Sequence, residues 1–227
     1  MGAGVQVVVG DGASGAPQAA PYDRVIATYA VERIPWAGVA QTRPGGRIVT
    51  PWGHLGHVAL TVADDGASAT GWVQGLAQFM PARGNARAHV DFLQVRGTGT
   101  PDAERPFLHD LAPLTDPHFQ FALRVALPEV QITTARDEDG LNAWIHDTDR
   151  SWAMLAAVGD GKTMATQGGP RRLADDLEAA WETWEQLGRP ALYDYGMTIT
   201  DHGTTQYMWA NDPTTGPRGP ISPDPPQ

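Results

Sequence analysis

Short apolar runs broken by glycine and acidic turns dominate the start of the chain. Residues 5–9 read Val-Gln-Val-Val-Val and residues 24–28 read Arg-Val-Ile-Ala-Thr. Both runs are short and β-branched, which predicts buried strands of a parallel sheet. The first run ends in Gly10, Asp11 and Gly12, so an acidic side chain follows directly on a strand. Ligands of open α/β sheets bind at the carboxyl ends of the strands, and Asp11 is therefore a candidate ligand-binding residue.

The pattern that follows alternates between helix and strand. Residues 35–41 predict a short helix, with proline in its first turn, and residues 47–52 predict a third strand. Residues 57–62 and 71–73 predict an antiparallel pair joined by an Asp-Asp-Gly turn. This order is typical of the second half of a nucleotide-binding type of α/β domain.

The pattern changes in the second part of the chain. Residues 170–187 predict the clearest helix, with apolar residues at steps of three and four and Gly188 as its stop. Residues 192–200 and 205–209 predict a hairpin. The chain is expected to divide into a partial α/β domain at 1–84, a linker at 85–105, a smaller α+β domain at 106–211 and a disordered proline-rich tail at 212–227.

Composition narrows the functional classes. Lys+Arg 16 against Asp+Glu 26 gives a net charge of −10, and no basic run occurs. Nucleic-acid binding is not expected, because phosphate neutralisation needs clustered basic side chains. No apolar run approaches the roughly 20 residues of a membrane span, and no signal peptide is apparent, so a cytoplasmic protein with no membrane partner is expected.

Cysteine is absent, which excludes disulfides, thiolate catalysis and cysteine-ligated zinc. His54 and His57 lie three residues apart at the start of a predicted strand, and no third ligand accompanies them. No metal site is therefore expected.

Four segments together resemble the protein-L-isoaspartate O-methyltransferase family. In chain order they are residues 5–12, 20–28, 43–51 and 79–81. Each segment is common alone, and their order and spacing carry the resemblance. It implies the C-terminal half of a Rossmann-like class I methyltransferase sheet, with S-adenosyl-L-methionine as cofactor. It also implies methyl transfer to the carboxylate of an aspartyl or isoaspartyl residue in a protein or peptide.

The resemblance also implies roles for particular residues. The expected cofactor-binding residues are Gly10, Asp11, Gly12, Met80 and Pro81. The expected substrate-side residues are Tyr29, Ala30 and Val31. Asp11 either contacts adenine or is a plain turn residue. Tyr29 either contacts the substrate or is a packing residue. No catalytic residue is identified, because a carboxylate is already a nucleophile and transfer depends on alignment and water exclusion.

Several features depart from the repair enzymes of this family. The glycine-rich turn and the ribose-binding acidic residue are absent from the sequence, so the chain is expected to lack the N-terminal half of the domain. The open sheet edge would then favour a homodimer or a partner chain that completes the sheet. Residues 187–209 resemble extended homologues that modify ribosomal peptides. The alternative is a non-catalytic peptide- or partner-binding module derived from such an enzyme.

Overall fold

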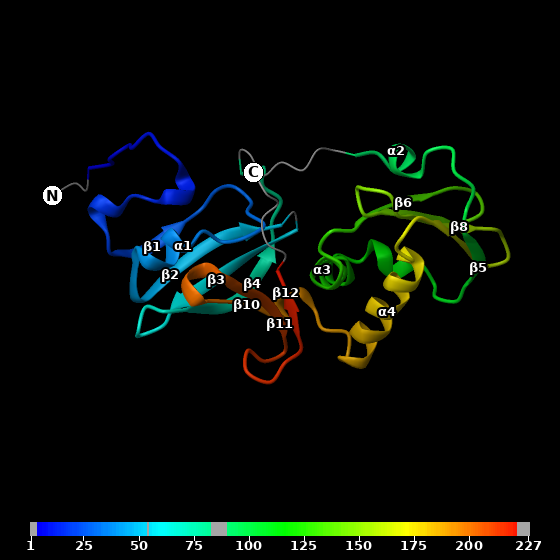
Figure 1. Cartoon of the computed structure of the whole chain (residues 1–227). Coiled ribbons are helices and arrows are strands. Elements are labelled where there is room, and N and C mark those ends of the chain that lie inside the picture. Colours follow the sequence, from blue (N-terminus) through cyan, green and yellow to red (C-terminus); the bar gives the residue numbers. More distant parts are fainter. Residues whose placement is uncertain (1–3, 54, 83–89, 222–227) are drawn as a thin grey trace. The chain divides into compact units, whose positions relative to one another are not determined.

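The chain folds into two compact units in a computed structural model that describes residues 4–53, 55–82 and 90–221 (Figure 1). Unit 1 combines Met1–Ala86 with Tyr193–Gln227, and unit 2 is the continuous stretch Arg87–Leu192. The α/β class predicted from the sequence is confirmed, since both units combine sheets with helices.

Unit 1 is built on a seven-stranded sheet with the order β1-β2-β3-β4-β10-β11-β12. The strands are β1 (Tyr22–Ile26), β2 (Thr42–Trp52), β3 (Gly56–Val62), β4 (Ala69–Leu76), β10 (Tyr195–Thr200), β11 (Thr205–Ala210) and β12 (Arg218–Pro220). Only β1 and β2 pair in parallel, and each later pair is antiparallel. The helical elements are η1 (Gly12–Ser14), η2 (Pro17–Ala19), α1 (Trp36–Ala40) and η5 (Asp201–Gly203).

The core of unit 1 includes a row of side chains that crosses this sheet from β2 to β11. Its fully buried side chains come from both parts of the chain, and they include Ile48, Leu60, Met197 and Met208. The predicted strands at 47–52, 57–62 and 71–73 are confirmed as parts of β2, β3 and β4, and the predicted short helix is confirmed as α1.

The predicted strand at residues 5–9 is wrong. The structure describes this segment without regular structure, and Val5, Val7, Val8 and Val9 are 60–98% exposed. An apolar run becomes a strand only where a neighbouring strand takes its backbone hydrogen bonds. The segment instead turns into η1, and β1 lies at the edge of the described sheet. The expectation that β1 is buried also fails at Ile26, which is 67% exposed.

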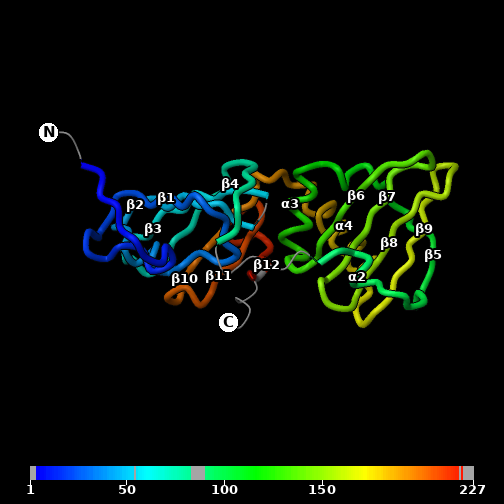
Figure 2. The backbone as a smooth tube through the Cα atoms, turned by 90° about the horizontal axis from the view of Figure 1, so that it is seen from above, coloured from blue at the N-terminus to red at the C-terminus, as the bar shows by residue number. Residues whose placement is uncertain are grey.

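Unit 2 is an antiparallel sheet with the order β5-β9-β8-β7-β6 (Figure 2). Its strands are β5 (Ala103–Phe107), β6 (Gln131–Arg136), β7 (Leu141–His146), β8 (Trp152–Ala157) and β9 (Thr163–Gly168). Its helical elements are α2 (Phe92–Arg96), η3 (Ala112–Thr115), α3 (Pro117–Ala126) and α4 (Leu173–Gln186), and η4 (Leu192–Asp194) lies where the chain returns to unit 1. The predicted helix at 170–187 is confirmed as α4, which buries Leu173, Leu177 and Trp181.

The division into units differs from the predicted domains. The predicted linker contains the helix α2. Asp91 caps the N-terminus of this helix and forms a capping box with Gln94. Residues 85–89 of that linker lie outside the described residues. The hairpin of β10 and β11 belongs to unit 1, because β10 pairs with β4 and buries Met197 and Ile199 there. Within the predicted disordered tail, Arg218–Pro220 pair with β11 as β12, and residues 222–227 are outside the described part.

No helix among the described residues has the length and apolar character needed to cross a membrane.

Candidate functional site

A cavity of about 280 Å³ lies in unit 1 against the face of β1 and β2. Its walls come from the segment around η1, from the stretch between β1 and α1, and from α1 itself. Most of the lining is apolar, which is typical of pockets that bind small organic groups. The lining residues used below are Gly12, Tyr22, Tyr29, Val31, Gly38, Gln41 and Thr50.

The segment that precedes β1 is held over the cavity by two side chains. Gln41, at the end of α1, accepts a hydrogen bond from the Ala16 amide at 2.8 Å and donates to the Ser14 carbonyl at 2.9 Å. The Tyr22 hydroxyl donates to the Ala16 carbonyl. These bonds satisfy backbone groups that no strand pairing serves, and they fix one wall of the cavity.

Three of the predicted site residues meet in this cavity. Gly12, predicted on the cofactor side, and Tyr29 and Val31, predicted on the substrate side, all line it. A Cβ atom at Gly12 would lie 3.0 Å from the Tyr29 hydroxyl oxygen, so glycine permits this close approach. The two sets of residues expected on separate sides of a site therefore share one wall.

Gly10 and Asp11 lie beside the cavity and do not line it. The Asp11 carboxylate caps η1 by accepting a hydrogen bond from the Ala13 amide at 2.9 Å. That bond is the local turn contact typical of aspartate. A carboxylate has a second oxygen, so this capping role leaves room for a contact with a ligand amino group.

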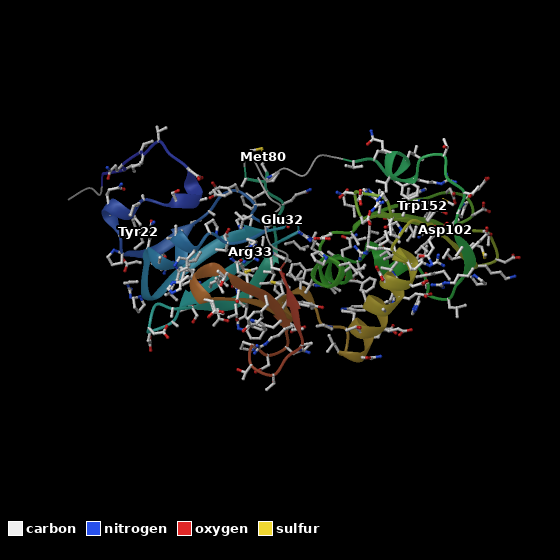
Figure 3. The ribbon with its side chains drawn as sticks, in the orientation of Figure 1. Tyr22, Glu32, Arg33, Met80, Asp102 and Trp152 are labelled. Carbon is white, nitrogen blue, oxygen red and sulfur yellow. The ribbon has the colours of Figure 1, made fainter. Side chains whose placement is uncertain are left out.

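Ala30, Met80 and Pro81 are brought together by backbone pairing. The Ala30 amide donates to the Met80 carbonyl at 2.9 Å, and the Ala82 amide donates to the Ala30 carbonyl at 2.9 Å. Met80, which Figure 3 labels, is 83% exposed, whereas Ala30 and Val31 are 4% exposed. The Ala30 side chain is therefore packed in the interior, and its backbone makes the contact with residues 80–82.

The sequence did not identify the two side chains that hold the cavity wall. Tyr22 lies in a common Pro-Tyr-Asp turn, and Gln41 follows a short helix as an ordinary polar residue. Neither position carries a periodic or motif signal, because each acts on backbone groups more than five residues away. Spacing between short motifs could not reveal such contacts.

No group of three or more potential metal ligands gathers in the described ranges. The Nδ1 atom of His57 is buried without a hydrogen-bond partner, and His54 lies outside the described residues.

Comparison with known proteins finds similarity in the part of the chain that contains the cavity. Residues 2–85 match the sequence model described as protein-L-isoaspartate(D-aspartate) O-methyltransferase. A protein-L-isoaspartate O-methyltransferase of Hyperthermus butylicus is 47% identical over 60 residues, which cover 26% of this chain and 25% of that protein. One from an Anaeromyxobacter species is 53% identical over 49 residues, which cover 22% and 23%.

A solved structure of a protein-L-isoaspartate O-methyltransferase aligns over 90% of this chain and 59% of that chain, with a TM-score of 0.41 and 15% identity. The chain spans about a quarter of the length of the first two relatives. The resemblance found in the sequence is confirmed: residues 2–85, which contain the η1 segment, β1 and the cavity, match the protein-L-isoaspartate O-methyltransferase family.

Proposed function

We propose that this chain is part of an S-adenosylmethionine-dependent carboxyl O-methyltransferase that acts on aspartyl or isoaspartyl residues. The observation that carries the proposal is that Gly12, Tyr29 and Val31 converge on one cavity within the segment that matches the methyltransferase family. The cofactor supplies an activated methyl group, and the work of the protein is to align the two reactants and exclude water.

The residues present fit the adenine end of this cofactor. Gly12 opens a close approach on an apolar wall, and the neighbouring Asp11 carboxylate can accept from an exocyclic amine. In the proposal Gly10, Asp11 and Gly12 contact the adenine side of the cofactor. Met80 and Pro81 lie on a segment that comes back to the cofactor later in the chain. Tyr29, Ala30 and Val31 flank the substrate.

The substrate is proposed to be a protein or peptide, with either a damaged isoaspartyl residue or an aspartate of a ribosomal peptide as the acceptor. The Tyr29 ring supports the narrower, peptide-modifying alternative, because a large side chain at this place restricts the acceptor more than a small one would. Peptides that carry Asp or isoAsp in the same sequence context distinguish the two.

Cofactor binding tests the proposal directly. Calorimetric titration with S-adenosylmethionine is run on the 227-residue chain and, in parallel, on the longest in-frame product of its gene. Binding by either product is expected, and Asp11→Asn in the binding product should raise Kd about tenfold through loss of a charged acceptor. Asp65→Asn is the matched control, because Asp65 makes the same turn contact, with the Ala67 amide at 2.8 Å, in a β3–β4 turn.

Absence of cofactor binding by both products would contradict the enzyme and favour the alternative of a non-catalytic peptide- or partner-binding module. If Asp11→Asn and Asp65→Asn changed the cofactor Kd equally, Asp11 would not contact adenine. The proposal that the chain is part of a methyltransferase would be unaffected.

We also propose that a second copy or a partner chain pairs with β1. The support is that β1 is the edge of the described sheet and that Ile26 on it is 67% exposed. Sedimentation should show self-association that Ile26→Lys reduces, while Val158→Lys, at an exposed valine of unit 2, leaves it unchanged. A monomer at all concentrations would contradict the homodimer.

A further inference from the structure

The stretch that joins the cavity to α1 is bonded to the C-terminal part of unit 1. Gln206 on β11 is 5% exposed, and its amide group serves both backbone groups of Ile34. Its oxygen accepts from the Ile34 amide at 3.0 Å, and its nitrogen donates to the Ile34 carbonyl at 2.8 Å. The Gln206 side chain thus satisfies the backbone hydrogen bonds of Ile34, as a neighbouring strand would, although the two residues are 172 positions apart in the sequence.

Arg33 makes a second link to the same part of the chain. Its guanidinium donates to the Ile221 carbonyl at 3.0 Å and to the Gly203 and Thr204 carbonyls at 2.9 Å each. A planar guanidinium can bind several carbonyls at once, which a lysine ammonium matches poorly. These bonds fix residue 33 between the turn after β10 and the residue that follows β12.

The turn itself packs closely on the start of α1. The His202 ring contacts the Trp36 ring edge-on with centroids 5.4 Å apart. Gly203 has a φ of +85°, and a Cβ there would lie 2.9 Å from Cβ of Trp36. Glycine is therefore required both by the backbone conformation and by the approach to α1.

The other end of the stretch is bonded within the N-terminal part. The Val31 amide donates to the Pro51 carbonyl at 3.2 Å, and the Gly53 amide donates to the Val31 carbonyl at 2.9 Å. Together with the Ala30 contacts to residues 80–82, these bonds hold the stretch on one side while Gln206 and Arg33 hold it on the other. Val31, which lines the cavity, lies within this doubly held stretch, and Tyr29, which also lines it, directly precedes Ala30.

We propose that Gln206 and Arg33 are positioning residues that set the place of Tyr29 and Val31 in the cavity wall. The segment from β10 to Ile221 is thereby part of the methyltransferase site, although it lies outside the stretch that matches the family. The inference rests on the proposed function only for the statement that this wall faces the substrate. Neither side chain touches the reacting atoms in this proposal.

Amide hydrogen exchange tests the positioning without reference to activity. Gln206→Leu removes both bonds to Ile34, so faster exchange of the Ile34 amide is expected on any account. The proposal further requires that the Ala30 and Val31 amides exchange about tenfold faster, while the Leu60 amide in the centre of β3 stays unchanged. Gln74→Leu is the matched control, because Gln74 is an exposed glutamine on β4 of the same sheet.

Faster exchange confined to Ile34 would overturn the proposal, and so would equal acceleration at Leu60, which indicates general destabilisation. Arg33→Lys provides a milder variant if Gln206→Leu does not fold. It keeps the charge and loses the planar geometry, and it should accelerate Ala30 and Val31 exchange less than Gln206→Leu does, with no change at Leu60. No acceleration at Ala30 and Val31 in this variant would equally contradict the proposal.

A kinetic measurement separates this inference from the proposed function. In the product that binds S-adenosylmethionine, Gln206→Leu should raise KM for the acceptor peptide about tenfold and leave cofactor Kd unchanged. An unchanged KM alongside faster Ala30 and Val31 exchange would overturn the substrate-side part of the inference alone. If no product binds cofactor, the proposed function fails, and the exchange experiment still decides whether Gln206 positions the wall.

Discussion

Unit 1 and unit 2 both rest on largely antiparallel sheets, but they are assembled differently along the chain. Unit 2 takes all five strands from one continuous stretch, whereas unit 1 takes four strands from before unit 2 and three from after it. The family match covers only the first part of unit 1. On the proposal made above, the candidate site of unit 1 depends also on Gln206, which lies after unit 2 in the sequence.

The two units should lose stability separately, and the largest expected effect lies in unit 2. Leu177 on α4 is 0% exposed, and Leu177→Ala leaves a cavity under that helix. The expected loss is about 3 kcal/mol in the free energy of unfolding of unit 2. Denaturant titration followed by amide exchange should show faster exchange in β7 and β8 and no change in β3. Equal acceleration in both units would contradict separate assembly.

The corresponding test in unit 1 is made where the returning segment joins the sheet. Gly196 on β10 has no room for a side chain, because a Cβ would lie 2.2 Å from the Trp209 ring and 2.6 Å from the Gly71 carbonyl. Gly196→Ala should cost about 2 kcal/mol in unit 1 through overpacking. Urea unfolding monitored by amide exchange of β3 and β4 measures the loss. Unchanged exchange there would mean that the returning strands do not stabilise the N-terminal part.

Acid should weaken unit 2 at one identifiable ion pair. Arg105 on β5 contacts Glu178 and Asp175 on α4 at 2.5 and 2.6 Å. The hydrogen bond from Arg105 lowers the pKa of Asp175 below its ordinary value. A carboxyl group with a lowered folded-state pKa adds stability above its unfolded pKa, near pH 4, and this stability is lost as pH falls through the folded value.

Arg105→Met should accordingly destabilise unit 2 by about 1 kcal/mol at neutral pH, since the pair is partly exposed. The difference from the unmodified chain should shrink below about pH 4. Arg172→Met is the control, because the Arg172 guanidinium lies 3.7 Å from Asp175 and should matter less. Thermal unfolding at a series of pH values checks this, and a difference independent of pH would contradict the role of Asp175.

The smallest expected effect is a gain in stability at the cavity. Gly38 in α1 lines the cavity, and a Cβ there meets no atom within 4 Å outside its own helix. Gly38→Ala should stabilise unit 1 by about 0.5 kcal/mol by restricting the unfolded chain. Calorimetric melting measures the shift. A loss of stability would show that the cavity wall is less open than its geometry indicates.

Local patterns predicted much of the fold. The periodicity of α4 and the turn between β3 and β4 depend on neighbours in sequence, and both predictions are confirmed. Residues 5–9 carry a strand pattern, yet a strand also requires a partner, which their composition does not specify. The hairpin of β10 and β11 was likewise recognisable, but its pairing with β4 depends on contacts across more than a hundred residues.

The candidate site was predictable to a similar degree. Gly12, Tyr29 and Val31 were identified, and they share the cavity. Ala30 was also identified; its side chain is buried and its backbone makes the contacts with residues 80–82. Gln41 and Gln206 were not predicted as site residues, because no sequence pattern indicates that a glutamine side chain will bond to a distant backbone group.

Transfer of a labelled methyl group tests the central claim most directly. The chain and the longest in-frame product of its gene are incubated with labelled S-adenosylmethionine and matched peptides that contain Asp or isoAsp, and base-labile ester is measured. The account predicts ester formation on at least one of these peptides, reduced by Asp11→Asn and not by Asp65→Asn. No ester on either peptide with either product would contradict a carboxyl methyltransferase.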